Sequence, residues 1–488
     1  MTRKILLASA LAIFAVPAYF GLSNVTGEQA SATPQSSYPQ TGNKASQSTA
    51  FNAEDRDLLL TLLEPHRPFS GRDLKAEVSA RFDQSWIAPS LEVINFVSSF
   101  EMRQHLISEL EKETGQFFGR DVNRWFRWLW NQDYVDAAGY DDFKAEFYKE
   151  IDERFERYFE GRAEQSRIRL DEVRWGGVLQ DGIPPLRNPK MLDVKQAKFM
   201  GDDDIVFGIE VNGDVRAYPK RILAWHEMFT DTVGNVDVTG VYCTLCGTFI
   251  LYDSVHAGVK HNLGTSGFLY RSNKLMYDAK TQSLWNTLKG EPVIGSLVGK
   301  NIQLDHRSVV TTTWGKWKKL HPNTKVVSLD TGYRRNYDEG VAYHDYFATD
   351  DLMFNTPYRD SRLANKQEVL ALRFKGQFGT LAINTDFLDR NPVYMGKLDR
   401  QPFVVITDES GANRVYDPGD LKFVKRDINH VTDATGIKWK ISEAKLIASD
   451  GRELKRLPYH RAFWFGCCLL YTSPSPRDAT LSRMPSSA

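Results

Sequence analysis

The sequence predicts an α+β protein in which a helical N-terminal region precedes a mainly β, internally duplicated domain. Three observations predict this fold class. Apolar residues recur at helical spacing over residues 51–166. From Arg167 onward, short runs rich in Val, Ile, Phe and Tyr alternate with Gly, Asn and Asp, as in strands joined by turns. Segments of this second region also resemble one another in the same order, which indicates a duplication.

The start of the chain predicts export. Arg3 and Lys4 precede an almost wholly apolar run from Ile5 to Leu22, which is the pattern of a secretory signal. Because the run approaches the roughly 20 residues of a membrane span, residues 1–25 are expected to be a signal peptide or a retained membrane anchor. Residues 26–50 are rich in small and polar residues and are expected to form a flexible tether. We therefore expect an extracytoplasmic protein, periplasmic or secreted, which is membrane-tethered if the leader is retained.

Composition excludes some classes of function. The chain has 488 residues, of which 42% are hydrophobic, so it can bury a sizeable core. Lys plus Arg and Asp plus Glu are both 62, so no whole-protein attraction for nucleic acid is expected. No convincing nucleotide-binding glycine loop, G-x-S-x-G or H-E-x-x-H motif occurs. Common kinases and hydrolases are thus unsupported, no cofactor can be assigned, and whether the protein is an enzyme stays open.

Residues 51–166 are predicted to form a helical domain that folds separately from the rest of the chain. Asn52 precedes the apolar run at Leu58, which is typical of a helix start. Aromatic residues then recur at helical spacing, and such stripes are more often core than ligand platforms. The stripe residues are Trp125, Phe126, Trp128, Trp130, Phe143, Phe147, Phe155 and Phe159.

Residues 167–466 are predicted to form the β-rich domain. The run Ile205–Val211 followed by Asn212-Gly213 is a strong hairpin signal. Residues 205–213 align with 368–376, and 241–253 align with 405–417, which predicts halves at about 168–345 and 346–466.

The second half keeps residues that shape the fold, but it lacks the two cysteines and the histidine of the first half. Cys243 aligns with Thr407, Cys246 with Ser410, and His226 with Leu388 or Asp389. This contrast indicates that Cys243, Cys246 and His226 serve something other than folding.

The last residues, 467–488, are expected to be an artefact. From Cys468 to Asp478 the sequence resembles a translated sequencing adaptor, and Ser482 to Ala488 resembles the outer adaptor of the same libraries. No part of the predicted fold depends on this segment. Of the four cysteines, only Cys243 and Cys246 then remain.

The segment Cys243-Thr-Leu-Cys246 between two predicted strands allows three interpretations. Two thiols three residues apart can form a reversible redox pair, and a nearby cation, for which His226 is the candidate, would lower a thiol pKa. A structural disulfide is the second interpretation, natural outside the cytoplasm. A metal site is the third, with His256 and His261 completing a zinc set, or with either His226 or Met276 joining a copper-type set.

In combination, several motifs resemble the domain-of-unknown-function 3179 family of bacterial and archaeal proteins. The matching segments are Asp171–Val178, Asp181–Pro184, Arg216–Pro219, Trp225–Glu227, Val241–Thr248, Gly264–Tyr270, Leu275–Asp278, Ser283–Trp285 and His460–Gly466. The helical region lies outside the resemblance.

The resemblance implies an uncharacterised and usually exported protein. Selenocysteine is assigned to the C-x-x-C-like motif of some family members, which favours a redox role for Cys243 and Cys246. Other members lack the second cysteine, and many have proline where this chain has Thr244. His256 and His261 are not part of the family pattern. We therefore expect a thiol-based oxidoreductase or redox-responsive protein acting on a redox partner, with a non-enzymatic metal- or small-ligand-binding module as the alternative.

Overall fold

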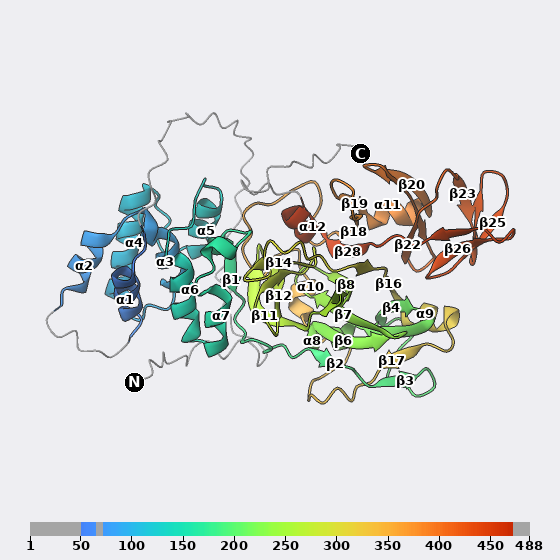
Figure 1. Cartoon of the computed structure of the whole chain (residues 1–488), viewed down its shortest axis with the longest axis horizontal. Helices are drawn as coiled ribbons and strands as arrows, with labels where there is room; N and C mark the ends of the chain where they lie inside the picture. The colour runs from blue at the N-terminus through green and yellow to red at the C-terminus, as the bar shows by residue number, and fades with distance from the viewer. Residues whose placement is uncertain (1–49, 65–71, 472–488) are drawn as a thin grey trace.

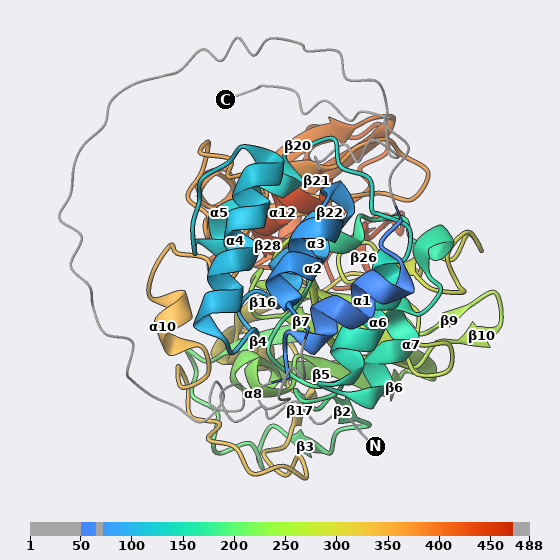
Figure 2. The same ribbon diagram turned by 90° about the vertical axis from the view of Figure 1, so that its left-hand side faces the viewer.

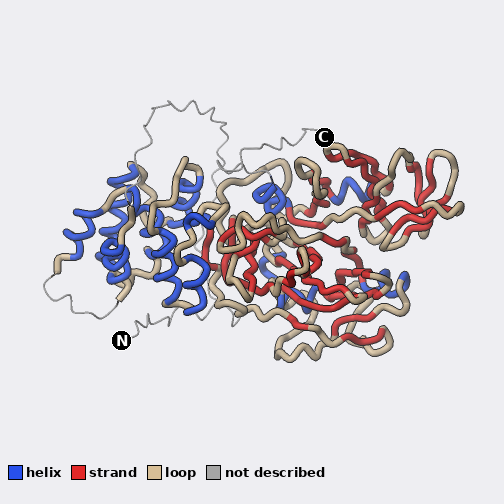
Figure 3. Tube along the Cα trace, viewed as in Figure 1, coloured by secondary structure: helices blue, strands red, loops and turns tan. Residues whose placement is uncertain are grey.

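The computed structural model describes residues 50–64 and 72–471, and within these ranges helices precede strands as predicted (Figure 1; Figure 3). The expected leader at 1–25, nearly all of the tether at 26–50 and the chain from 472 onward lie outside the described residues. Among the helices of the described ranges, none is both long enough and apolar enough to cross a membrane.

The helical region begins at a capping box. The Asn52 side chain accepts hydrogen bonds from the backbone N–H groups of Glu54 and Asp55, and the Asp55 carboxylate accepts one from Asn52 N–H. These bonds satisfy donors that a first helical turn otherwise leaves without partners. The α-helices of the region are α1 (Ala53–Thr61), α2 (Leu74–Arg81), α3 (Ile87–Val93), α4 (Phe100–Thr114), α5 (Val122–Trp130), α6 (Tyr140–Lys149) and α7 (Glu156–Phe159).

The aromatic stripes are core, as predicted, and their core continues into the β region. Phe268 contacts the rings of Tyr148, Phe155, Tyr158 and Phe159, with ring centroids 4.8 to 5.9 Å apart. Phe268 belongs to a sheet ordered β1-β11-β12-β13-β14, against which the helices pack. In Figure 1, α6 and α7 lie beside this sheet, and in the turned view of Figure 2 the helical region stands in front of the strands. Its strands are β1 (Val173–Trp175), β11 (Leu263–Tyr270), β12 (Asn273–Asp278), β13 (Leu284–Asn286) and β14 (Glu291–Ile294).

The first half of the β region contains two further five-stranded sheets, ordered β16-β4-β5-β17-β3 and β15-β8-β7-β6-β2. The predicted hairpin joins β4 to β5 through Asn212 and Gly213, whose φ angles of +49° and +81° suit a two-residue turn. The elements are β2 (Leu186–Arg187), β3 (Met191–Asp193), β4 (Ile205–Val211), β5 (Asp214–Pro219), α8 (Lys220–His226), β6 (Met228–Val233), β7 (Val236–Cys243), β8 (Thr248–Asp253), β9 (Val255–His256), β10 (Val259–Lys260), β15 (His306–Arg307), β16 (Val310–Thr313), α9 (Trp314–Leu320), β17 (Lys325–Val327) and α10 (His344–Phe347).

The second half repeats this order of elements. In both halves a β-hairpin, a helix and a three-stranded meander are followed, after an insertion, by a strand that pairs with the first strand and leads into a helix. The elements are β18 (Glu368–Leu372), β19 (Leu381–Asn384), α11 (Thr385–Arg390), β20 (Val393–Leu398), β21 (Gln401–Thr407), β22 (Asn413–Tyr416), β28 (His460–Phe463) and α12 (Trp464–Tyr471). The insertion is a separate sheet of β23 (Phe423–Arg426), β24 (His430–Asp433), β25 (Lys438–Ile441), β26 (Lys445–Ala448) and β27 (Glu453–Lys455).

The pairing corrects the alignment around the cysteines by one residue. Tyr242 N–H donates to the carbonyl of Glu227, and Thr407 N–H donates to the carbonyl of Pro392 in the equivalent place. Tyr242 therefore matches Thr407, and Cys243 matches Asp408 rather than Thr407. The loop after Thr407 is one residue shorter than the loop after Tyr242, and this difference causes the shift. Beyond the two loops the predicted match of Tyr252 with Tyr416 holds. By the same register His226 matches Asn391 rather than Leu388 or Asp389.

Candidate functional site

The two cysteines lie in the loop of the β7–β8 hairpin. Cys243 ends β7, Thr248 begins β8, and Cys243 pairs with Thr248 across the loop. Cys243 and Cys246 form a disulfide with their Cα atoms 5.5 Å apart, and they are only 1% and 0% exposed. Gly247 comes next with φ +59°, a conformation that favours glycine and turns the chain back into β8.

Segments distant in sequence cover this loop. The carbonyl of Cys246 accepts a hydrogen bond from Phe463 N–H of β28 at 2.8 Å, and the carbonyl of Leu245 accepts one from the Tyr346 hydroxyl of α10 at 2.6 Å. A Cβ atom at Gly466 would lie 2.9 Å from Cys246 Cβ, so glycine is needed there for the close approach of α12. The disulfide is thus enclosed by aromatic residues of the second half and of the segment around α10.

A buried charge pair lies beside the loop. Glu227 Oε1 accepts hydrogen bonds from the Thr244 hydroxyl at 2.8 Å and the Tyr343 hydroxyl at 3.1 Å. Its Oε2 lies 2.7 Å from Lys274 Nζ of β12. Burial lowers the pKa of Lys274, although Glu227 acts in the opposite direction. Glu227 is the C-cap of α8 and has φ +56°, a left-handed conformation with which helices commonly end.

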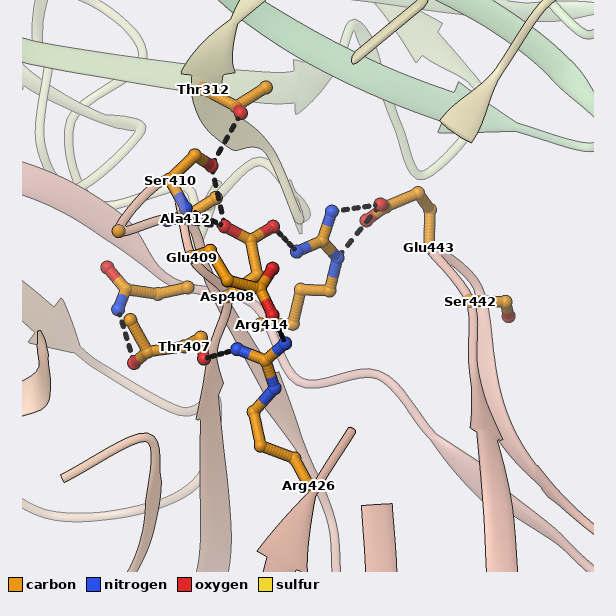
Figure 4. A network of polar contacts seen from close by, with 12 residues as sticks. Thr312, Thr407, Asp408, Glu409, Ser410, Ala412, Arg414, Arg426, Ser442 and Glu443 are labelled. Carbon is orange, nitrogen blue, oxygen red and sulfur yellow. Dashed lines mark hydrogen bonds and ion pairs between the residues drawn. The ribbon is translucent and has the colours of Figure 1, made fainter. Parts of the chain in front are cut away.

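The second half bridges the equivalent loop without thiols (Figure 4). Asp408 Oδ1, at the position of Cys243, accepts a hydrogen bond of 2.6 Å from the hydroxyl of Ser410, at the position of Cys246. Asp408 also accepts bonds from Ala412 N–H and from the Arg414 guanidinium. Pro392 stands where the first half has Glu227, so Glu227 has no counterpart, and the ion pair of this loop joins the bridging Asp408 to Arg414 at 2.9 Å instead.

His226 does not contact the cysteines. It is the last residue of α8, and its Nδ1 and Nε2 lie 2.8 Å from the Pro184 carbonyl and 2.6 Å from the Tyr337 hydroxyl. Burial lowers its pKa, so the neutral imidazole predominates near pH 7. The expected cation beside the thiols is therefore not His226. The buried cation of this site is Lys274, which comes from another strand.

The metal-binding candidates are not brought together. His261 is paired with Asp278 at 3.1 Å, His256 lies in the short β9, and Met276 is buried in β12 opposite Thr265. Within the described residues, no group of three or more His, Cys, Asp or Glu side chains is arranged to hold a metal ion. The zinc and copper ligand sets proposed from the sequence therefore do not form in this structure.

Lys274 and Tyr343 belong to the site although neither was expected there from the sequence. Lys274 lies in a strand whose residues are all buried, and a lysine in such a strand signals a buried partner. Tyr343 carries no such signal, because a tyrosine in a loop is common.

Comparison with known proteins agrees with the motifs found in the sequence. No curated protein and no solved structure matches the chain. One family model, described as a protein of unknown function (DUF3179), matches residues 180–468. This match includes the cysteine loop, β28 and the start of α12, and it spans more than half of the chain. The chain belongs to the DUF3179 family.

Proposed function

We propose that the protein is a thiol–disulfide redox protein whose centre is the pair Cys243 and Cys246. The observation that carries this proposal is the contrast between the two halves. The second half holds the same loop with a hydrogen bond between Asp408 and Ser410, so this loop can form without a covalent bridge. A disulfide there adds a reaction that a carboxylate and a hydroxyl cannot perform.

The reaction is an exchange with an external dithiol. A thiolate of the dithiol attacks one sulfur of the Cys243–Cys246 bond, and the other cysteine leaves as a thiolate that takes up a proton. The second thiol of the dithiol then breaks the mixed disulfide. The partner leaves as a disulfide, and this protein is left with two thiols, having gained two electrons and two protons. Run in reverse, the same steps make the protein a reductant of the partner.

The buried pair Glu227 and Lys274 supports this chemistry. A thiolate formed in an enclosed loop is costly unless a proton or a cation is at hand. Thr244, between the two cysteines, is hydrogen-bonded to Glu227, which is paired with Lys274. The first loop thus has an ion pair beside its bridge, whereas in the second loop the paired carboxylate, Asp408, is itself part of the bridge.

The enclosure of the disulfide restricts how a redox partner can reach it. Because both cysteines are almost fully buried, a partner reaches them only after the aromatic residues around Tyr346 and Phe463 move. We propose a redox partner that displaces this cover, acting outside the cytoplasm, where the leader of residues 1–25 would direct the protein. A fusion of residues 1–50 to a reporter that is active only after export tests that location, and activity confined to the cytosol would contradict it.

The redox role is tested with a variant in which Cys467→Ser and Cys468→Ser remove the other two thiols. Only Cys243 and Cys246 can then react. We expect the free-thiol count of the folded protein to change from none to two on equilibration with dithiothreitol, and to return on oxidation, with circular dichroism unchanged. The matched control adds Cys243→Asp and Cys246→Ser, which copy the bridge of the second half and should fold without reacting. A disulfide that reacts only in denaturant would identify an inert staple.

The alternative function is a ligand-binding module in which the disulfide is structural. The near-complete burial of the pair favours this alternative, because a passive staple needs no access.

A further inference from the structure

A cavity of about 210 Å³ lies between the two halves, away from the cysteine loop. One wall comes from the first half, through Lys289, Gln303 and His306. The other comes from the second half, through Arg373, Lys375 and His460. Three cationic side chains and a single carboxylate, Asp305, line the cavity, so positive charges outnumber negative ones in its lining.

Arg373 is the central charge of the cavity. Its guanidinium donates to the carbonyl of Lys289 at 3.5 Å, and Gln303, with its amide oxygen turned toward Arg373, accepts from both terminal nitrogens at 2.8 and 3.2 Å. Both partners are neutral, and no carboxylate of the described residues is paired with Arg373. By contrast, Lys375 is paired with Asp305 at 2.7 Å, and Lys289 lies 3.8 Å from Glu291.

Two histidines add neutral hydrogen-bonding groups to the cavity. The rings of His306 and His460 lie 5.5 Å apart, centroid to centroid. His306 Nε2 is buried and has no hydrogen-bond partner in the described part of the chain. Burial and Arg373 lower the pKa of His306 to about 3, so its imidazole is neutral near pH 7. A buried polar atom left without a partner is costly unless something binds to it.

These features identify the class of ligand. A guanidinium without a carboxylate partner recognises the oxygens of a carboxylate or phosphate, often through two parallel hydrogen bonds. A neutral imidazole can donate one more hydrogen bond to such an oxygen. A metal cation would instead meet the repulsion of Arg373. We propose that this cavity is a binding site for a small oxyanion, a phosphate or a carboxylate, held by Arg373 with Lys289 and His306.

The test is calorimetric titration of the full chain, with its disulfide intact, with sodium phosphate and with sodium acetate at matched ionic strength. We expect saturable binding of at least one anion with one site per chain. Arg373→Gln should weaken that binding by at least about tenfold, because a hydrogen bond to a charged group is lost. The matched control is Arg400→Gln, an exposed arginine in the β20–β21 turn, outside the cavity, which should leave binding unchanged.

The two anions distinguish the sources of the ligand: preference for phosphate indicates a phosphorylated compound, and preference for acetate indicates an organic acid. Should Arg373→Gln fail to fold, Lys289→Gln replaces it, with an expected loss of at least about threefold. The proposal is overturned if neither anion binds saturably at millimolar concentration, if the cavity variant binds as the parent does, or if only zinc chloride binds. Because the titration needs no thiol chemistry, its result is independent of the redox proposal.

Discussion

Single residues decide how closely the cysteine loop is packed, and Gly247 is the clearest example. Its φ is +59°, and a Cβ atom there would lie 2.8 Å from the ring of Phe463. Gly247→Ala should therefore combine backbone strain with overpacking and lower the free energy of unfolding by about 2–4 kcal/mol. Gly419 has a similar φ of +56° with open space around it, so Gly419→Ala measures the strain alone. Urea unfolding of both variants gives the comparison, and equal losses would show that Phe463 does not restrict the loop.

The ion pair beside the loop gives a second prediction at the scale of residues. Glu227→Gln leaves Lys274 buried without its counter-charge, which should cost about 3–5 kcal/mol of stability, measured by urea unfolding. Adding Lys274→Met removes that charge, so the double variant should regain most of the loss. A double variant as unstable as the single one would mean that the loss does not come from the uncompensated charge of Lys274.

At the scale of elements, one buried carboxylate connects segments of the second half with each other and with the first half. Glu443, in the turn between β25 and β26, lies 2.7 Å from Arg414 of β22, 3.1 Å from Arg456 and 3.6 Å from His321 beyond α9. Burial alone would raise the pKa of Glu443, but Arg414, His321 and Arg456 together hold it well below its ordinary value.

This carboxylate should make the free energy of unfolding decrease at acidic pH. A lowered pKa in the folded state means that the stabilisation is fully present above the unfolded pKa of about 4.3 and is lost as the pH falls below it. Glu443→Gln should therefore cost about 3–5 kcal/mol at pH 7 and reduce the further loss of stability below pH ~4.3. Glu453→Gln, which changes a half-exposed carboxylate of the same sheet, is the matched control and should have little effect. Urea unfolding between pH 3 and 7 provides the measurement, and equal acid sensitivity of the two variants would contradict the assignment.

Elements were predictable from the sequence where their cause is local. Asn212 and Gly213 predict their hairpin because the turn itself requires positive φ at both positions. The surroundings of the cysteines were not predictable in this way. Lys274 and Tyr343 reach Glu227 from a strand and a loop distant in sequence. His226 was expected near the thiols because the second half lacks it together with the two cysteines. Helix α8 ends between His226 and Glu227, and the two side chains have separate partners.

At the scale of the whole molecule, the parts of the chain are interlocked. The first loop is hydrogen-bonded to β28 of the second half through Phe463, and the second loop is bonded to β16 of the first half through Ser410 and Thr312 at 2.9 Å. The helical region in turn shares one hydrophobic cluster with the sheet that contains β11. The change of periodicity near Arg167 predicts that residues 51–166 fold separately from 167–466. The shared core instead leads us to expect that their stabilities are coupled.

Phe268 tests that coupling, because it is 1% exposed and contacts four aromatic residues of the helical region. Phe268→Ala should cost about 3–5 kcal/mol through the cavity that it leaves. Hydrogen exchange should then accelerate in α6 and α7 as well as in β11 and β12, and thermal unfolding should remain a single transition. Phe403→Ala is the control: Phe403 is fully buried in a cluster of the second half that contains no residue of the helical region. It should leave the exchange of α6 and α7 limited by global unfolding. Phe268→Ala could instead split thermal unfolding into two transitions, with β12 still protected from exchange while the helices exchange. That result would show that the helical region folds independently of the sheet.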